Sequence, residues 1–284
     1  MPLPEHLIAR AAELIQQADG LIVAAGAGMG VDSGLPDFRG NSGFWQAYPA
    51  LANAGLEFAQ IACPAAFHAQ PELAWGFYGH RLGLYRRTRP HAGFALLRHW
   101  GEQMPQAYSV FTSNVDGQFQ RAGFDAGRVN ECHGSIHHLQ CLHACSADIW
   151  GADQFEPEVD DVTCRLRNAA PLCPHCGRLA RPNILMFGDW DWNQQRQIAQ
   201  ATRQQRWLQS LERPLVIELG AGSAIPSVRH FSQTILQHHG GRLIRINPRE
   251  ADVASDKDVG LAVGALEGLT SIAAMLGNDW HPEN

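Results

Sequence analysis

The chain opens with a predicted helix that leads into a buried strand. Apolar residues recur there at helical spacing, and they are Leu7, Ile8, Ala11, Leu14 and Ile15. Gly20 supplies a stop for this helix, and the apolar run 21–25 then predicts a buried strand. The strand runs straight into a glycine-rich loop at 26–30. A strand that feeds a glycine-rich turn is typical of the opening of a nucleotide-binding α/β unit.

Three further short apolar runs, 108–112, 215–219 and 243–246, each end in small or polar residues. They predict parallel strands whose carboxyl ends line one crevice. Two stretches do not show this pattern of short apolar runs. Residues 41–90 are rich in alanine and aromatic residues and are predicted to be helical, whereas 140–181 are rich in cysteine and polar residues, with weak periodicity.

We therefore predict an α/β fold with a Rossmann-like parallel sheet flanked by helices and a smaller zinc-binding and helical module. The expected division is discontinuous along the chain. The nucleotide-binding domain comprises 1–40, 91–133 and 182–284, and the small domain comprises the helical insertion 41–90 and the cysteine-rich insertion 134–181.

Composition and charge narrow the class of protein. With 284 residues, 45% of them hydrophobic, the chain is long enough to bury a substantial core. It contains no apolar run of about 18 residues, so no transmembrane helix is predicted, and its first 20 residues do not resemble a signal peptide. The net charge of -6 gives no overall attraction to nucleic acid or to an anionic membrane. Seven cysteines without an export signal favour metal ligation or catalysis over disulfides and predict a cytoplasmic location.

The glycine loop is a candidate site for an anionic ligand. Gly26, Gly28 and Gly30 form G-x-G-x-G rather than the dinucleotide fingerprint G-x-G-x-x-G, and the acidic residue expected about 20 positions later is missing. Glycines let backbone N–H groups approach a pyrophosphate closely. A tight turn without a ligand is the alternative.

The cysteine-rich stretch is a candidate metal site. Cys141 and Cys145 are spaced C-x3-C, and Cys173 and Cys176 are spaced C-x2-C. Two thiolate pairs can surround one structural zinc ion and cross-link a segment that is too polar to fold alone. His143, Cys164 and His175 are close enough in sequence to replace one of these ligands. Free cysteines in a small core are the other alternative.

Four motifs in order resemble the sirtuin family. They are GAGMGVDSGLPDFRG at 26–40, TSNVDGQFQRAG at 112–123, ECHGS at 131–135 and RPNILMFGD at 181–189. The resemblance extends from about residue 21 to residue 247. Three positions depart from the family pattern, because Gly30 replaces the usual serine, Ser113 the glutamine and Gln118 an apolar residue.

The resemblance implies an enzyme that consumes NAD to remove acyl groups, such as acetyl, from protein lysines, releasing nicotinamide and O-acyl-ADP-ribose. It implies that His133 deprotonates a ribose hydroxyl, for which the ordinary pKa of histidine, about 6.5, is suitable. Asn114 and Asp116 would position the nicotinamide and a water molecule. A purely structural core histidine is the alternative for His133, and no family role falls on His137 or His138.

The resemblance also implies the residues that contact the cofactor and the zinc ion. Phe38 and Arg39 would cover the reacting ribose. The loop 220–223 stands where the family has a loop at the adenosine half, and Asn247 matches an asparagine at the adenine ribose, although it is also a common turn residue. The expected cofactor contacts are Gly26, Ala27, Gly28, Asp37, Phe38, Arg39, Ser113, Asn114, Asp116, Gly220, Gly222, Ser223 and Asn247. The expected zinc ligands are Cys141, Cys145, Cys173 and Cys176.

Residues 60–81 resemble the branch of sirtuins that acts on succinyl- or malonyl-lysine. Tyr78 and Arg81 have that branch's Y-x-x-R spacing, which places both on one helix face, and Ala62 matches its small pocket residue. Such a pair can hold an acyl carboxylate by charge-assisted hydrogen bonds. Simple packing of Tyr78, with Arg81 in solvent, is the alternative.

The expected substrate is an acyl-lysine protein or peptide, with no nucleic-acid or membrane partner. It would add as a strand near 187–189, so Phe187 and Gly188 are candidate substrate contacts. Two alternative activities use the same fold. They are mono-ADP-ribosyl transfer to a protein and hydrolysis of NAD by a module that lacks deacylase activity.

Overall fold

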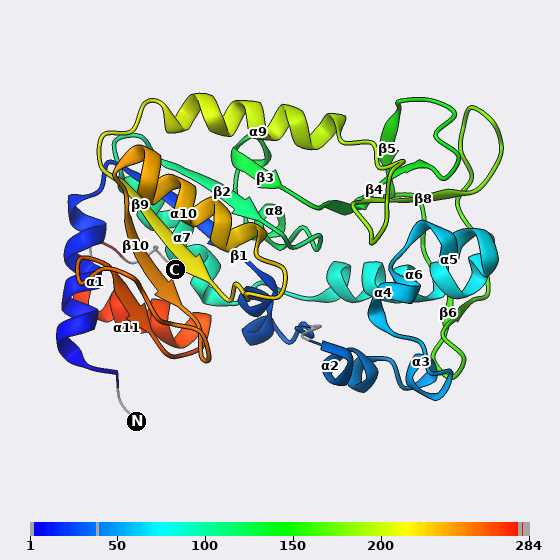
Figure 1. Cartoon of the computed structure of the whole chain (residues 1–284), viewed down its shortest axis with the longest axis horizontal. Coiled ribbons are helices and arrows are strands. Elements are labelled where there is room, and N and C mark those ends of the chain that lie inside the picture. The colour runs from blue at the N-terminus through cyan, green and yellow to red at the C-terminus, as the bar shows by residue number, and fades with distance from the viewer. Residues whose placement is uncertain (1–2, 38–39, 278–279, 281–284) are drawn as a thin grey trace.

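The larger part of the molecule is built on a six-stranded sheet (Figure 1). The computed structural model describes residues 3–37, 40–277 and 280. The strands lie in the order β11-β10-β9-β1-β2-β3, and every pair is parallel. Their bounds are β1 Gly20–Ala25, β2 Tyr108–Thr112, β3 Val129–Glu131, β9 Pro214–Leu219, β10 Arg242–Ile246 and β11 Val259–Leu261. The parallel sheet predicted from the apolar runs is confirmed.

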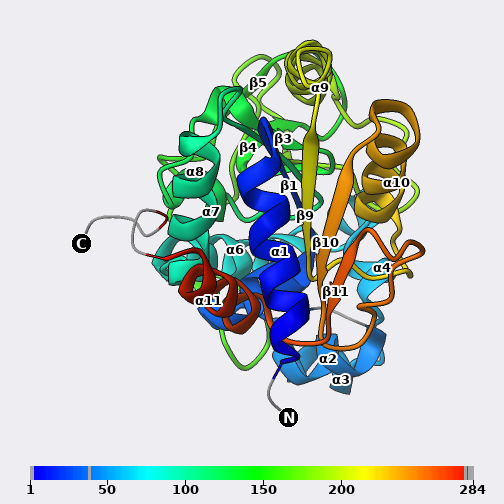
Figure 2. The ribbon, with the colours of Figure 1, turned by 90° about the vertical axis from the view of Figure 1, so that its left-hand side faces the viewer.

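Helices cover both faces of this sheet because the side chains of its strands alternate between the faces. In β1, Leu21, Val23 and Ala25 enter one core. That core is shared with α1 (Glu5–Gln17), α7 (Ala92–Gln103) and α11 (Ala265–Leu276). Ile22 and Ala24 enter the other core, shared with α9 (Gln195–Leu208) and α10 (Ser227–His239). Figure 2 shows α7 and α11 on one side of the strands and α10 on the other.

Both sequence insertions fold into the smaller part of the molecule. The stretch predicted to be helical contains α2 (Gly40–Ala47), α3 (Pro49–Asn53), α4 (Phe58–Ile61), α5 (Pro64–Ala69) and α6 (Pro71–Arg87). The cysteine-rich stretch belongs to a three-stranded antiparallel sheet in the order β5-β4-β8, with β4 (Gly134–Cys141), β5 (Ile149–Gly151) and β8 (Ala180–Ile184). A hairpin, β6 (Val159–Asp160) and β7 (Arg165–Leu166), lies beside α6.

One hydrophobic core joins the two insertions. Trp75 and Phe77 of α6 pack in the same cluster as Leu139 of β4 and Ile184 of β8. The Trp75 indole donates a hydrogen bond of 3.0 Å to the carbonyl of Ala180. The shared core agrees with a small domain made from both insertions, and the proposed boundaries of that domain stay a prediction.

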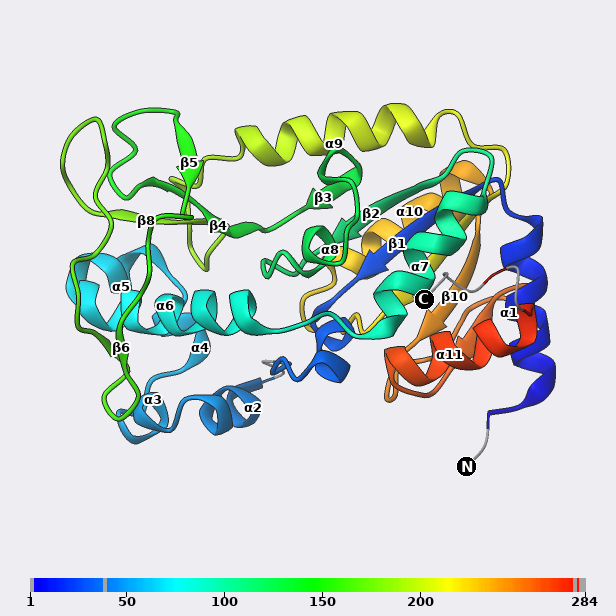
Figure 3. The ribbon, with the colours of Figure 1, turned by 180° about the vertical axis from the view of Figure 1, so that it is seen from behind.

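The chain order reverses at the centre of the main sheet. From β1 the chain moves to β2 and β3, and later to β9, β10 and β11 on the other side of β1. Ligands of open α/β sheets bind at such a switch point, beyond the carboxyl ends of the strands. Figure 3 shows the sheet from behind, with α9 running above β3 and α8 (Gln118–Arg121). Within the described residues, no helix is long and apolar enough to cross a membrane.

Candidate functional site

The strand ends bring four of the predicted site residues side by side. Ala25 of β1 is in register with both Thr112 of β2 and Leu219 of β9, and Leu219 is in register with Ile246 of β10. The strands therefore end level with one another. The next residue on each strand is a predicted cofactor contact, and these residues are Gly26, Ser113, Gly220 and Asn247.

A cavity of about 760 Å³ opens at these strand ends, between the sheet and the small module. This size is within the usual range for a small-molecule site. The predicted site residues that line the cavity are Gly26, Ala27, Ala62, Tyr78, Arg81, Ser113, Asn114, Asp116, His133, Phe187, Gly220, Gly222 and Ser223. Gly28, Asp37, Gly188 and Asn247 do not line it. Phe38 and Arg39 lie outside the described residues.

The two glycine loops pack directly on each other. The backbone N–H of Gly28 donates to the carbonyl of Gly220 at 3.1 Å. A Cβ at Gly220, where φ is +56°, would lie 2.3 Å from the Cα of Gly28, and a Cβ at Gly26 would lie 2.8 Å from the Cα of Ala221. These glycines are thus required by loop–loop contact, while Gly26 and Ala27 still face the cavity.

Asn247 does not line the cavity but forms hydrogen bonds with residues that do. Its amide donates to the carbonyl of Ala221 at 2.9 Å, and its side-chain oxygen accepts the backbone N–H groups of Arg249 and Glu250. The side chain therefore makes the turn that an asparagine after a strand commonly makes. A contact with the adenine ribose stays a prediction.

Asn114 and Asp116 are held in the cavity wall by backbone contacts. The Asn114 amide donates to the carbonyl of Gly26 at 3.0 Å. A carboxylate oxygen of Asp116 accepts the backbone N–H of Gln118 at 2.9 Å. Burial raises the pKa of Asp116 to about 6, even though the Gln118 hydrogen bond acts to lower it. Asp116 can therefore exchange a proton near neutral pH.

His133 lies just after β3 and faces the same cavity. Its Nε2 is 3.1 Å from the hydroxyl oxygen of Ser227, the first residue of α10. Burial lowers the pKa of His133, and a backbone hydrogen bond with Ser113 partly opposes that shift. The imidazole is therefore neutral at pH 7 and able to act as a base.

Ser227 is a site residue that sequence reasoning missed. It lies 94 positions from His133 in the chain, and a serine at the start of a helix normally indicates only a capping role. His137 and His138 line a different cavity, and Nε2 of His137 is 2.9 Å from the backbone carbonyl oxygen of Asp116. His137 therefore makes a structural contact with the segment that carries Asp116.

Tyr78 and Arg81 come together in the cavity on α6. The guanidinium of Arg81 lies 5.7 Å from the centre of the Tyr78 ring and is buried. Its Nε and Nη2 donate to the hydroxyl of Tyr85 at 3.0 and 2.8 Å. Among the described residues, the Tyr78 hydroxyl has no hydrogen-bond partner. Tyr85, four residues after Arg81, is a second missed residue, and the i, i+4 spacing on the helix was the signal that could have found it.

A buried ion pair supports the loop that follows β8. The side chains of Arg181 and Asp189 are both fully buried and form two parallel hydrogen bonds of 2.6 and 2.8 Å. This pairing holds residues 185–188, where Phe187 is 43% exposed at the edge of the cavity. The N–H of Phe187 donates to the carbonyl of Ala62 at 3.0 Å. Gly188, with φ of +62°, makes the turn of the loop.

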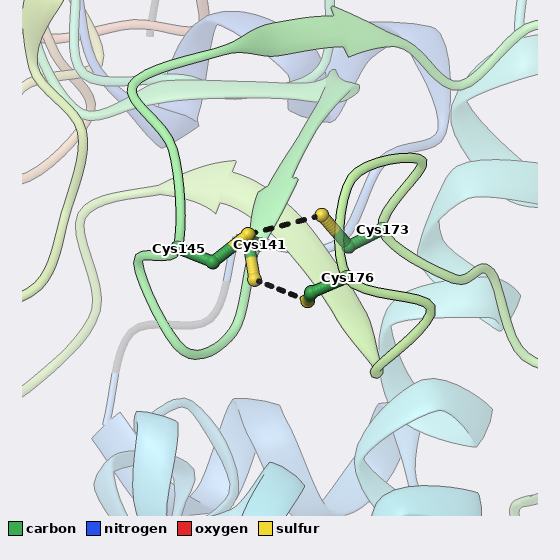
Figure 4. A group of neighbouring side chains, drawn as sticks. All are labelled: Cys141, Cys145, Cys173 and Cys176. Atoms are coloured by element: carbon green, nitrogen blue, oxygen red, sulfur yellow. Dashed lines mark hydrogen bonds between the residues drawn. The ribbon is translucent and has the colours of Figure 1, made fainter.

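The four predicted zinc ligands form one cluster (Figure 4). All four sulfur atoms lie within 4.8 Å of one another. The distances Cys141–Cys176 and Cys145–Cys173 are 3.7 and 3.5 Å. A disulfide would need about 2.05 Å, whereas a zinc tetrahedron with Zn–S bonds of about 2.3 Å has edges of roughly 3.8 Å. The residues therefore fit a structural zinc ion.

The other candidate ligands lie outside this cluster. Cys164 is buried in the core of the small module, where its carbonyl packs against Gly76. His175 contacts Asp148, and the ring of His143 packs against His68. Of the described residues, only the four cysteines form a group of possible metal ligands. The C-x3-C spacing is accommodated by a turn in which Ala144 has a φ of +47°.

Comparison with known proteins places this geometry in a family. A model of the Sir2 family matches residues 26–211. A Corynebacterium efficiens protein named NAD-dependent protein deacylase 2 is 31% identical over 97% of this chain and 100% of its own length. An Aquifex aeolicus protein named NAD-dependent protein deacylase is 27% identical over 89% of this chain and 93% of its own. A solved structure of a Sir2 homolog–NAD complex is 24% identical to this chain. The match covers 94% of this chain and 93% of the solved chain with a TM-score of 0.69, so the two share a fold.

Proposed function

The chain belongs to the Sir2 family, and from this premise we propose that it is an NAD-dependent protein deacylase that acts on acyl-lysine side chains. The observation that carries this proposal is the position of His133. Its imidazole shares one cavity with Asn114 and Asp116, at the switch point of the sheet. NAD, when bound, supplies an electrophilic ribose carbon to which the acyl oxygen bonds as nicotinamide leaves.

The protein's own groups have separable tasks in this reaction. A neutral imidazole donates from one nitrogen only. The contact with the Ser113 backbone raises the pKa of His133, as a hydrogen bond to a carbonyl does, so we infer that Nε2 accepts a hydrogen bond from the Ser227 hydroxyl. A ribose hydroxyl that takes the place of the Ser227 hydroxyl at Nε2 would give its proton to the same nitrogen. Asn114 and Asp116 would hold the nicotinamide and a water molecule beside it.

Replacement of Ser227 by alanine is expected to lower kcat by about fivefold near pH 6.5, since one hydrogen bond that orients a neutral imidazole is lost. A hydroxyl that donates to neutral histidine favours the unprotonated base, so its loss raises the pKa of His133. The acid limb of the kcat–pH profile should therefore move to higher pH. Thr234→Ala, an exposed change on the same helix, is the control. An unchanged pH profile would show that Ser227 does not position His133.

One assay tests the proposed function. The protein is incubated with labelled NAD and with acetyl-, succinyl- and malonyl-lysine peptides, and freed lysine and O-acyl-ADP-ribose are measured. We expect both products from at least one peptide. Attachment of ADP-ribose to protein without release of any acyl group would refute deacylation. NAD hydrolysis alone would refute it as well. The relatives named as deacylases favour neither of these alternatives.

The substrate peptide is proposed to lie along residues 185–189. Leu185 and Phe187 are 39% and 43% exposed there, and both line the cavity. Backbone pairing with an added strand tolerates many sequences, which suits an enzyme that acts on proteins. The buried Arg181–Asp189 pair keeps this loop in place for such pairing.

We propose that the acyl pocket accepts an acidic acyl group. The guanidinium of Arg81 and the unpaired hydroxyl of Tyr78 line the same cavity as His133. Arg81 is also fixed, by its two hydrogen bonds to Tyr85 and by the surrounding rings. A positioned guanidinium and a phenol can bind one carboxylate together. Ala62 leaves room beside them.

Replacement of Arg81 by methionine should lower kcat/KM for succinyl- and malonyl-lysine peptides by about 100-fold, because a buried charge-assisted contact is removed. Activity on acetyl-lysine should change by less than about threefold. The matched control is Arg87→Met, an exposed arginine in the last turn of the same helix. Kinetics with all three peptides make the comparison. Equal losses for acetyl and acidic peptides would rule out the acidic pocket.

A further inference from the structure

A second cavity, of about 610 Å³, adjoins the first at Asp116, which lines both. It is bounded by the end of α6, by α8, by β4 and by the part of α9 from Arg196 to Arg203. Figures 1 and 3 both show α9 running above β3 and α8. Residues of α8 and α9 line this cavity. Asp116 and Tyr85 line both cavities, whereas the glycine loops and His133 line only the first.

The second cavity is positively charged in a chain whose net charge is -6. Four arginines line it, and Asp116 is the only carboxylate among the described residues that does so. Two of the arginines are neutralised nearby, because Arg86 pairs with Glu156 at 3.0 Å and Arg196 pairs with Glu131. Arg121 and Arg203 have no carboxylate partner among the described residues. Arg121 and Arg203 therefore add two positive charges that no ion pair offsets, and Asp116 adds one negative charge when it is ionised, so the lining keeps a net positive charge.

These two arginines are held by the backbone and keep their remaining donors available. Nε of Arg121 donates to the carbonyl of Thr88 at 2.9 Å, and Nε of Arg203 donates to the carbonyl of Gly127 at 3.2 Å. Their terminal nitrogens have no partner within the described part of the chain. Nη1 of Arg196 is buried in the same region and also lacks a partner. A buried guanidinium nitrogen without an acceptor is costly unless a ligand supplies one.

We propose that this cavity binds the phosphate group of a small phosphomonoester. A phosphate carries a charge of about -1.5 to -2 at pH 7, and the guanidiniums of Arg121 and Arg203, which no carboxylate pairs among the described residues, attract it. Its oxygens accept the paired N–H groups that arginine offers in a fixed geometry. The volume leaves space for an organic group beyond the phosphate. The site is separate from the proposed cofactor cavity, because Arg121, Arg196 and Arg203 do not line the latter.

Calorimetric titration of the full chain with inorganic phosphate, at constant ionic strength set with sodium chloride, tests the proposal. We expect saturable binding of one phosphate per chain. Arg121→Gln and Arg203→Gln should each weaken it by about tenfold, because each removes charge-assisted hydrogen bonds. Arg206→Gln, an exposed change on the same helix and outside the cavity, should leave binding unchanged. Circular dichroism of each variant checks that the fold is retained.

Repeating the titration with saturating ADP-ribose separates the two cavities. Phosphate binding that persists supports a distinct second site. Phosphate binding that disappears with ADP-ribose would place the ion in the cofactor cavity and overturn the proposal. Absence of saturable binding, or equal effects of Arg203→Gln and Arg206→Gln, would overturn it too. Each of these results is independent of the deacylase assay, so either proposal can fail alone.

Discussion

Replacing His133 by alanine is expected to abolish measurable deacylation while the fold is retained. Loss of a positioned general base lowers a rate by about 10²- to 10⁴-fold. His133 is suited to that role because burial lowers its pKa and keeps the imidazole unprotonated at neutral pH. In the alanine variant the Ser227 hydroxyl remains, but an uncharged hydroxyl is too weak a base to replace the imidazole. The measurement is kcat for O-acyl-ADP-ribose formation at pH 7.5.

The matched control for this change is His230→Ala, which removes an exposed histidine from α10. It should retain full activity. Thermal unfolding should show that the His133 variant remains folded, because the imidazole lies at the cavity wall and belongs to none of the three hydrophobic cores. A His133 variant with more than about a tenth of the original kcat would exclude this residue as the base.

The central sheet could be predicted from sequence because its strands are apolar on both faces. Residues 21–25 are a continuous apolar run, and 215–219 are apolar except for Glu218, which pairs with Arg245; the structure buries both runs between two layers of helices. The strands β4 and β8 gave no such signal. Polar residues such as Gln140 and Asn183 are buried there in a hydrogen bond to each other, so these strands have no continuous apolar run that sequence could reveal.

The candidate site was predictable where short motifs carry it and not where distant segments meet. The amide of Asn114 and the imidazole of His133 face one cavity, as their motifs suggested. The Ser227–His133 contact joins segments that no local pattern relates. The close packing of Gly220 on Gly28 is likewise a tertiary effect, and sequence alone suggested instead a loop open to the ligand. The basic second cavity depends on four arginines from three elements, so charge counting along the chain could not reveal it.

Replacement of Cys176 by alanine should remove the zinc ion and lower the midpoint of thermal unfolding by at least about 10 °C. The segment between β4 and β8 has little regular secondary structure, since β5 has three residues and β6 and β7 have two each, and only a few of its side chains, such as Cys164 and Leu166, are buried in the core of the small module. A zinc ion bound by four thiolates would cross-link the two ends of this segment. One end carries Cys141, the last residue of β4, and the other carries the turn that begins at Cys173. Zinc content by mass spectrometry and calorimetric unfolding make the measurement.

The cross-link should also affect activity indirectly, which distinguishes it from a catalytic metal. Gly134 of β4 pairs with Ile184 of β8, and the carbonyl of His133 accepts the N–H of Leu185 at 2.9 Å. Loosening β4 and β8 would therefore disturb both the proposed base and the proposed peptide loop, and activity should fall in step with the folded fraction. Cys63→Ser, which changes a thiol outside the cluster, should keep one zinc per chain and full stability. A Cys176 variant that keeps its zinc ion and unfolding midpoint would show that this thiolate is not a required ligand.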